Sequence, residues 1–363
     1  MTTVRGVGAL RFAAPTVLAV LAIASPAAAA APGFLGTGHD PGVAVDAAGT
    51  AHVAWLAEAA GGAGTLEYCQ VPRGKRRCTV RTSVPLEDDG FGKVQVMLPA
   101  PGTVQIVAPL LQSTPLLTSV DGGATFARRD LGEGPAIEAA FYDAGGAISI
   151  MSGSGPARYG RYAPDGTGPA GLPVEFGDAL ESLDTTLAPF GSGLVALFSG
   201  AATRSVIFSG TSDPNLQQSW VEGPRLGKGR TDPTAAGGRS GTYVAYVQRR
   251  NGRHDTYVRR LRSSARFGPA RRVSREDPTD LALAEGPRGN LALVYPASDD
   301  AWIVRSRDGR RWTGPRRLFR GHEPADLRIV LGRRGGWMVW DGDAGNAGSN
   351  PIRIAALPGP PRR

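Results

Sequence analysis

The sequence is poor in lysine, histidine and aromatic residues, and each shortage argues against a class of protein. Only three of its 41 basic residues are lysine, and this arginine bias, together with the many alanines and glycines, is typical of a GC-rich bacterial genome. The net charge of +9 therefore does not predict a nucleic-acid partner. The four histidines have no metal-ligand spacing: they are His39, His52, His254 and His322. No phosphate-binding loop, dinucleotide fingerprint or G-x-S-x-G motif is present.

Long apolar runs are also scarce, and the longest lies at the N-terminus. Ala13–Ala24 follows Arg5 and Arg11 and precedes a run of small residues that ends at Ala31. This pattern predicts a signal peptide over residues 1–31, because the apolar run is too short to span a bilayer comfortably. A retained N-terminal anchor is the alternative. We expect a soluble, exported mature chain without an integral membrane segment, located in the periplasm, the cell envelope or outside the cell.

Cysteine occurs only twice. Cys69 and Cys78 bracket a turn signal at Pro72–Gly74, so a hairpin there would bring the two thiols together. In an oxidising compartment this predicts a disulfide. Two thiols without a nearby histidine make a poor zinc site, and the spacing is wrong for a CxxC redox pair.

Glycine and proline are abundant instead, with 51 and 29 residues, which argues against a helical bundle and favours short strands joined by turns. Seven segments share an apolar run, a turn with glycine and a second apolar run. They are Val43–Trp55, Val94–Ala108, Ile137–Met151, Thr186–Phe198, Ala235–Tyr246, Leu281–Tyr295 and Leu327–Trp340. Their mean spacing is about 48 residues, and further short apolar runs follow each one.

This repeat predicts an all-β fold, a β-propeller of four-stranded antiparallel blades. Counting hairpins favours seven blades, with six as the alternative. No polar linker interrupts the repeat, so we expect a single domain over residues 32–358 and a disordered tail over 359–363. The last unit lacks a fourth strand, which Phe34–Gly36 can supply; otherwise that blade has three strands.

Two turns resemble the Asp box, S-x-D-x-G-x-T-[WF]. The first matches at every position and the second is a variant one residue shorter. Their motif residues are Ser119, Asp121, Gly123, Thr125 and Phe126 in the first, and Ser306, Asp308, Gly309 and Trp312 in the second. On these residues the chain resembles the sialidase/BNR-repeat superfamily of secreted β-propellers. The resemblance implies structural turns between third and fourth strands, on the face opposite the active site.

Sialidase chemistry is not supported by the other residues. The family uses a tyrosine nucleophile with a glutamate, an aspartate acid/base and three arginines that bind the substrate carboxylate. No [FY]-R-I-P motif is present near the N-terminus. Tyr246 and Tyr295 occupy the same repeat position as Trp55 and Trp340, which indicates packing rather than catalysis. The catalytic residues are therefore unknown.

Acidic residues recur just before the first strand of several units, usually followed by proline. They are Asp40, Asp232, Asp277 and Glu323. Turn chemistry is the favoured interpretation, and an axial ligand or cation site is the alternative.

The loop Asp341–Asn346 resembles a calcium loop only in part, so we expect no cofactor, with calcium as the open alternative.

Two hypotheses follow. The first is a non-catalytic, monomeric exported propeller that binds an extracellular glycan or protein through its upper loops. The second is an exo-acting glycoside hydrolase of sialidase type. Convergence of three guanidinium groups on a Tyr–Glu pair at the axis would favour the second.

The arginine-rich stretches Arg259–Arg275 and Arg305–Arg320 are interpreted as a solvated outer face, with weak binding of anionic glycans left open.

Overall fold

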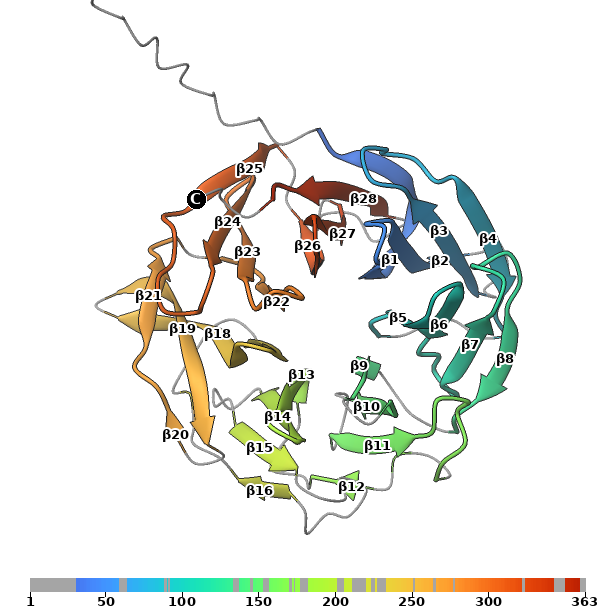
Figure 1. The fold of residues 1–363 in the computed structure, drawn as a ribbon, viewed down its shortest axis with the longest axis horizontal. Helices are drawn as coiled ribbons and strands as arrows, with labels where there is room; N and C mark the ends of the chain where they lie inside the picture. Colours follow the sequence, from blue (N-terminus) through green and yellow to red (C-terminus); the bar gives the residue numbers. More distant parts are fainter. Residues whose placement is uncertain are drawn as a thin grey trace, which may run out of the picture.

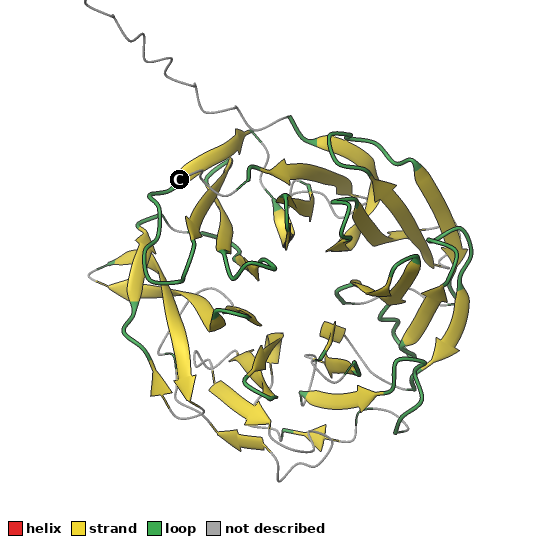
Figure 2. Cartoon of the chain, in the orientation of Figure 1, coloured by secondary structure: helices red, strands yellow, loops and turns green. Residues whose placement is uncertain are grey.

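The computed structural model describes residues 31–359 apart from 59–63, 88–89, 91, 133–136, 144–145, 153–156, 170–171, 173, 177–181, 201–205, 211–219, 223–225, 227–232, 251, 264–265, 277, 322–323 and 343–349. The described residues form strands and turns without any helix (Figure 2), and so contain no helix that could cross a membrane. Residues 1–30 of the expected signal peptide and residues 360–363 of the expected C-terminal tail lie outside them.

Four sheets have four strands each, joined in sequence order. Their strands are β5 (Gln95–Ala100), β6 (Thr103–Val107), β7 (Pro115–Ser119) and β8 (Ala127–Asp130); β9 (Ile137–Tyr142), β10 (Ile148–Ser152), β11 (Arg158–Tyr162) and β12 (Val174–Glu175); β13 (Ser182–Phe190), β14 (Gly193–Gly200), β15 (Val206–Gly210) and β16 (Trp220–Glu222); and β22 (Ala282–Glu285), β23 (Leu291–Ala297), β24 (Asp300–Ser306) and β25 (Arg316–Arg320).

The two remaining sheets are larger. One has the order β17-β18-β19-β20, with β21 also paired to β19: β17 (Thr234–Gly238), β18 (Gly241–Arg250), β19 (Arg253–Ser263), β20 (Arg266–Phe267) and β21 (Arg271–Ser274). The other has seven strands in the order β26-β27-β28-β1-β2-β3-β4: β26 (Ala325–Gly332), β27 (Gly335–Asp341), β28 (Asn350–Leu357), β1 (Gly33–Val45), β2 (Ala51–Glu58), β3 (Gly64–Val71) and β4 (Val80–Pro85).

The sheets form a ring around a central axis, with β1, β5, β9, β13, β22 and β26 innermost (Figure 1). All seven predicted hairpins are present as antiparallel strand pairs, from β1–β2 to β26–β27. The all-β propeller arrangement of antiparallel sheets is therefore confirmed. The predicted count of seven blades, or alternatively six, is not confirmed. Only four of the sheets formed by described strands are separate four-stranded blades.

The reason for the irregular count is that β1 pairs on both sides. Its first half pairs with β28, with Phe34 opposite Arg353, and its second half pairs with β2, with Val43 opposite Val53. A bulge near His39 separates the two registers. The N-terminal strand thus pairs with the last hairpin, as predicted, and joins the first and last repeat units into one sheet.

The hydrophobic core is divided into clusters that lie between neighbouring sheets. In one cluster, Tyr243 of β18 lies with Tyr295 of β23, and in another Tyr68 of β3 lies with Ile106 of β6. These side chains are at most 1% exposed. Adjacent sheets are therefore held together mainly by burial of apolar side chains between them.

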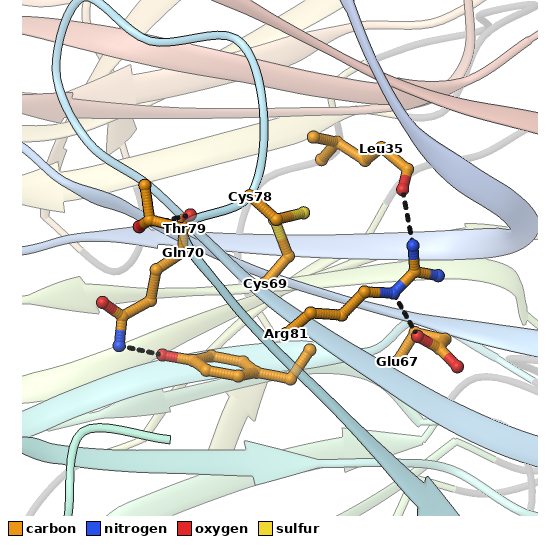
Figure 3. The surroundings of a disulfide bond; sticks show 8 residues. Leu35, Glu67, Cys69, Gln70, Cys78, Thr79 and Arg81 are labelled. Atoms are coloured by element: carbon orange, nitrogen blue, oxygen red, sulfur yellow. Dashed lines mark hydrogen bonds and ion pairs between the residues drawn. A yellow bond between two sulfur atoms is a disulfide. The ribbon is translucent and has the colours of Figure 1, made fainter. Parts of the chain in front are cut away.

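The predicted disulfide between Cys69 and Cys78 is present in the hairpin formed by β3 and β4 (Figure 3), with the Cα atoms 5.4 Å apart. Beside it, Arg81 Nε donates to Glu67 Oε2 at 2.9 Å and Arg81 Nη1 donates to the Leu35 carbonyl at 3.4 Å. The disulfide hairpin is therefore attached directly to the part of β1 that joins the ends of the ring.

Candidate ligand site on the propeller axis

A cavity of about 180 Å³ lies at the centre of the ring, lined by the innermost strands. Its polar lining consists of Lys93, Gln95, Glu138, Thr185, Thr186, Thr234, Asp280 and Arg328, and we call this site the axial pocket. The starts of neighbouring inner strands adjoin here, since the Lys93 N–H donates to the Ile137 carbonyl and the Val94 N–H to the Asp40 carbonyl. We call this end of the ring the upper face.

An ion pair in the axial pocket joins the segment just before β5 to β9. Lys93 Nζ lies 2.7 Å from Glu138 Oε2, and both side chains are less than 15% exposed. Gln95 Nε2 donates to the Glu138 carbonyl at 3.2 Å. Removing one member of a buried ion pair leaves the other as an uncompensated charge. With both members present, this wall of the pocket is polar and has no net charge.

Asp280 lies just before β22 and contacts the next inner strand. Its Oδ1 accepts the N–H of Leu281 at 2.6 Å, and its Oδ2 accepts the N–H of Leu327 in β26 at 2.8 Å. Burial raises the pKa of the Asp280 carboxyl, while the charges of Arg328 and Lys93 oppose the rise. Asp280 therefore connects two inner strands and brings a carboxyl group into a pocket that also contains two cations.

Thr185 in β13 adds a hydroxyl group. Its Oγ1 is buried and has no hydrogen-bond partner among the described residues. Cationic, anionic, amide and hydroxyl groups thus meet in one small cavity, which suits a ligand that both donates and accepts hydrogen bonds. The cavity is smaller than the roughly 300–1,000 Å³ of pockets for drug-sized molecules, so it fits one polar unit of a larger ligand.

Of the four acidic residues proposed to surround the channel, only Asp40 is described; Asp232, Asp277 and Glu323 lie outside the described residues. Asp40 has a φ of 52°, and its carboxylate contacts His39 Nδ1 at 3.0 Å. The described residues contain no group of three side chains placed to bind a metal ion. A ring of carboxylates with calcium stays a prediction, as does the loop after Asp341.

The first Asp-box turn connects β7 to β8, and its carboxylate binds its own backbone. Asp121 Oδ1 accepts the N–H groups of Ala124 and Thr125, both at 3.0 Å, and the Ser119 hydroxyl at 2.7 Å. Asp121 Oδ2 accepts the Thr125 hydroxyl at 2.7 Å. Hydrogen bonds from the Thr125 N–H and hydroxyl, followed by that from Ser119, lower the pKa of Asp121.

The second Asp-box turn connects β24 to β25 in the same way. Asp308 Oδ1 accepts the N–H groups of Arg310 and Arg311 at 2.8 and 3.2 Å, and Ser306 Oγ accepts the Gly309 N–H at 2.8 Å. Because strands alternate in direction, a turn after the third strand lies at the opposite end of a blade from the start of the first. Both turns therefore lie on the lower face, away from the axial pocket.

The two tyrosines considered as nucleophiles are packed inside the sheets. The Tyr295 hydroxyl donates to Ser274 Oγ at 2.8 Å, and burial raises the pKa of Tyr295 to about 12. Tyr246 stacks on Tyr257, with the ring centres 5.9 Å apart. The described lining of the axial pocket contains one arginine and no tyrosine. The described residues therefore do not form a sialidase-type constellation there.

Sequence reasoning missed the residues of the axial pocket. Lys93 and Asp280 both lie just before an inner strand, but neither fits the pattern of an acidic residue followed by proline that predicts an axial site. Glu138 and Arg328 lie near the starts of β9 and β26, inside two of the apolar segments that define the repeat. The usable signal was a charged residue of either sign at the start of a first strand.

Comparison with known proteins supports the fold. No protein-family model matches the sequence, and no curated protein matches it. Solved structures of β-propellers do match: the WD40 domain of coronin from Toxoplasma gondii has a TM-score of 0.60 at 10% identity, covering 90% of this chain and 85% of that one. YCF48 bound to D1 peptide has a TM-score of 0.55 at 13% identity, covering 90% and 96%.

A catalytically inactive virginiamycin B lyase from Staphylococcus aureus with quinupristin has a TM-score of 0.54 at 14% identity, covering 88% of this chain and 95% of the lyase. Identities this low establish a shared β-propeller fold and nothing about activity, because propellers with unrelated functions share one architecture. The function must therefore be argued from the axial pocket and the surface of this chain.

Proposed function

We propose that this protein is an exported, monomeric, non-catalytic β-propeller that binds an extracellular glycan or protein at its upper face. The observation that carries the proposal is the axial pocket, where the Lys93–Glu138 ion pair, Asp280 and the Thr185 hydroxyl line one cavity. Proteins usually bind small ligands in preformed cavities in which a few polar groups converge.

Membership of the Asp-box propellers, the sialidase/BNR-repeat type, is part of the proposal. Its support is the geometry of the two turns, in which an aspartate accepts successive backbone N–H groups between the third and fourth strands of a sheet. Export is supported by the Cys69–Cys78 disulfide, because disulfides persist in oxidising compartments. The N-terminal signal pattern provides independent support.

The chemistry of the axial pocket favours a ligand with several hydroxyl or amide groups. Two cations and two carboxylates leave the described walls without a large excess of either charge. A sugar unit or a polar peptide side chain at the end of a larger ligand fits such a pocket. The proposal is supported by the solved propeller structures of YCF48 bound to D1 peptide and of the virginiamycin B lyase with quinupristin, in which this architecture occurs with a ligand.

The test is a glycan array, together with an array of extracellular-protein peptides, probed with the purified mature chain. We expect a hit whose affinity falls about tenfold or more in Lys93→Met and in Thr185→Val, equivalent to about 1.4 kcal/mol. Lys75→Met is the matched control, because Lys75 is exposed in the disulfide hairpin, away from the axis. Binding that survives both pocket variants would contradict the proposed site.

Catalysis is tested separately with a fluorogenic sialoside. We expect no turnover above background, because Tyr295 donates to Ser274 rather than to a carboxylate. A sialidase needs a tyrosine whose proton a nearby glutamate accepts. Turnover abolished by a single Tyr→Phe change would replace the proposal by the hydrolase alternative.

A further inference from the structure

A second cavity, of about 370 Å³, lies on the lower face beside the second Asp-box turn. Its lining includes Leu291, Arg305, Arg307, Arg311, Trp312 and Thr313, and we call it the Arg305 pocket. It is larger than the axial pocket and lies within the range of about 300–1,000 Å³ typical of small-molecule sites. The function proposed above does not use it.

The Arg305 pocket contains hydrogen-bond donors that have no acceptor in the part of the chain that the structure describes. Among the described residues, Arg305 Nε and Nη2 are buried and have no hydrogen-bond partner, and the same is true of Trp312 Nε1. The backbone beside them is satisfied, because Arg305 and Thr313 exchange hydrogen bonds of 2.8 and 3.0 Å. Buried donors without acceptors are costly, so this arrangement requires an explanation.

Electrostatics add to this cost. Burial, together with the nearby Arg316 guanidinium, lowers the pKa of Arg305 to about 10, so the side chain is still charged at neutral pH. Arg307 and Arg311 also line the cavity, and the one acidic residue in its described lining is Asp308. Asp308 Oδ1 already accepts two backbone N–H groups of the turn. The pocket therefore has an excess of positive charge.

The first Asp-box turn shows that the fold does not require these arginines. At the corresponding positions it has Thr118, Val120 and Phe126, where the second turn has Arg305, Arg307 and Trp312. Val120 is 81% exposed. The same turn, with the same serine and aspartate, thus forms without a cationic pocket. The charge and the indole N–H are additions to the second turn.

We propose that the Arg305 pocket binds a carboxylate or sulfate group on a sugar unit of an acidic polysaccharide. Arg305 would pair with the oxyanion through its guanidinium group, and the indole N–H of Trp312 would donate to it. The cavity exceeds what a bare anion needs, and Leu291 and the Trp312 ring supply apolar surface for the carbon skeleton of a sugar. The site lies on the opposite face from the axial pocket and is independent of it.

The experiment is titration calorimetry of the mature protein with three hexasaccharides: oligogalacturonate, a heparin fragment and neutral maltohexaose. The first carries carboxylates, the second mainly sulfates, and the third has neither. We expect one or both anionic probes to bind and the neutral probe not to bind. Binding should weaken as salt rises, because the interaction is between charges. A thymidine oligonucleotide of matching charge tests whether any polyanion suffices.

Arg305→Gln is the test variant and Arg310→Gln its matched control. Arg310 belongs to the same exposed turn and carries the same charge, but it does not line the pocket. We expect affinity to fall about tenfold or more in Arg305→Gln and less than about twofold in Arg310→Gln. Trp312→Phe provides a second test that keeps an aromatic ring at this position, as Phe126 does in the first turn, and removes the N–H.

A thermal shift separates loss of binding from loss of folding. Saturating probe should raise the Tm of the wild type and not that of Arg305→Gln, whose Tm without probe should equal or exceed that of the wild type. The proposal is overturned by absence of binding to both anionic probes, by equal losses in Arg305→Gln and Arg310→Gln, or by equal affinity for the oligonucleotide.

Discussion

Asp341 is a buried acid among other acids. It lies at the end of β27, is 2% exposed, and its Oδ1 has no hydrogen-bond partner among the described residues. Burial, followed by the charges of Asp326 and Asp40, raises the pKa of Asp341 to about 7, while the Asp40 N–H and His39 oppose the rise. In the unfolded chain the same carboxyl titrates near its ordinary value of about 3.9.

This difference predicts that stability falls as pH rises from about 4 to about 7. Over that range the unfolded chain releases the proton while the folded protein retains it, so rising pH favours unfolding until the folded state also releases it. Asp341→Asn should remove this dependence and raise stability at pH 8 by on the order of 3 kcal/mol. Thermal unfolding at pH 5 and pH 8 measures both effects.

Asp299→Asn is the control for Asp341→Asn, because Asp299 is exposed in the turn between β23 and β24. We expect it to leave the difference in Tm between pH 5 and pH 8 unchanged. A wild-type Tm that is higher at pH 8 than at pH 5, with no gain in Asp341→Asn, would contradict this account of Asp341.

At the scale of structural elements, the Asp-box turns connect neighbouring sheets. The Tyr68 hydroxyl of β3 and Gln70 Nε2 both donate to the Gly122 carbonyl, and the Thr82 hydroxyl donates to that of Gly123 at 2.6 Å. The second turn repeats this arrangement, since the Tyr243 hydroxyl donates to the Asp308 carbonyl at 3.0 Å. Each turn thus closes its own hairpin and also contacts the preceding sheet.

Gly123→Ala tests the contact between the first turn and its neighbour. Gly123 has a φ of 95°, and a Cβ atom added there would lie 2.0 Å from Tyr68 Cε1. Both the left-handed backbone and the clash with the ring oppose alanine, so we expect a loss of about 2–4 kcal/mol in denaturant unfolding.

Gly102→Ala is the matched control for Gly123→Ala. Its φ is 75°, and an added Cβ atom would meet nothing within 4 Å. It should therefore lose only the backbone contribution of about 1 kcal/mol. Equal losses in the two variants would show that the contact between the turn and Tyr68 contributes little to stability.

The disulfide should stabilise the hairpin in which it lies. Cys69 and Cys78 are nine residues apart, so the crosslink closes a short loop in the unfolded chain. Replacing both residues by alanine should lower the free energy of unfolding by about 2–3 kcal/mol. Reducing the wild type with dithiothreitol should lower stability by a similar amount and leave the alanine variant unchanged. No loss in either case would indicate that packing around Cys69 determines the stability of this hairpin.

At the scale of the whole molecule, the ring closes through one strand. Residues 33–38 of β1 pair with β28, while residues 39–45 pair with β2. Leu35 is 4% exposed and belongs to the core cluster that contains Trp55 and Val339. Ring closure therefore combines backbone hydrogen bonds with burial of apolar side chains.

Removing the closing half of β1 should destabilise the ring. A chain that starts at residue 39 leaves one edge of β28 without its partner and exposes the Leu35 site, so we expect a large fall in Tm compared with a chain that starts at residue 32. Hydrogen exchange should show faster exchange of the β28 amides in the shorter chain. Equal Tm values would mean that the ring does not depend on this closure.

The sequence by itself determined the repeat, the hairpins and the disulfide, because each depends on residues close together along the chain. Alternating apolar runs around a glycine specify a hairpin locally, and the Cys69–Cys78 spacing needs only that hairpin. The Asp-box turns are local in the same sense, since Asp121 binds N–H groups three and four residues ahead.

Only the tertiary structure decided how the sheets join and where charged side chains meet. The sequence predicts that the N-terminal segment pairs with the last hairpin, but not that this pairing and the β1–β2 pairing belong to one continuous strand. The bond from the Leu327 N–H to Asp280 also connects residues far apart in sequence, which no local pattern encodes. The same holds for the Lys93–Glu138 pair, in which Lys93 lies just before β5 and Glu138 lies in β9 of the next sheet. A ring places the start of every inner strand near one axis, so its binding groups are assembled by closure rather than by any one segment.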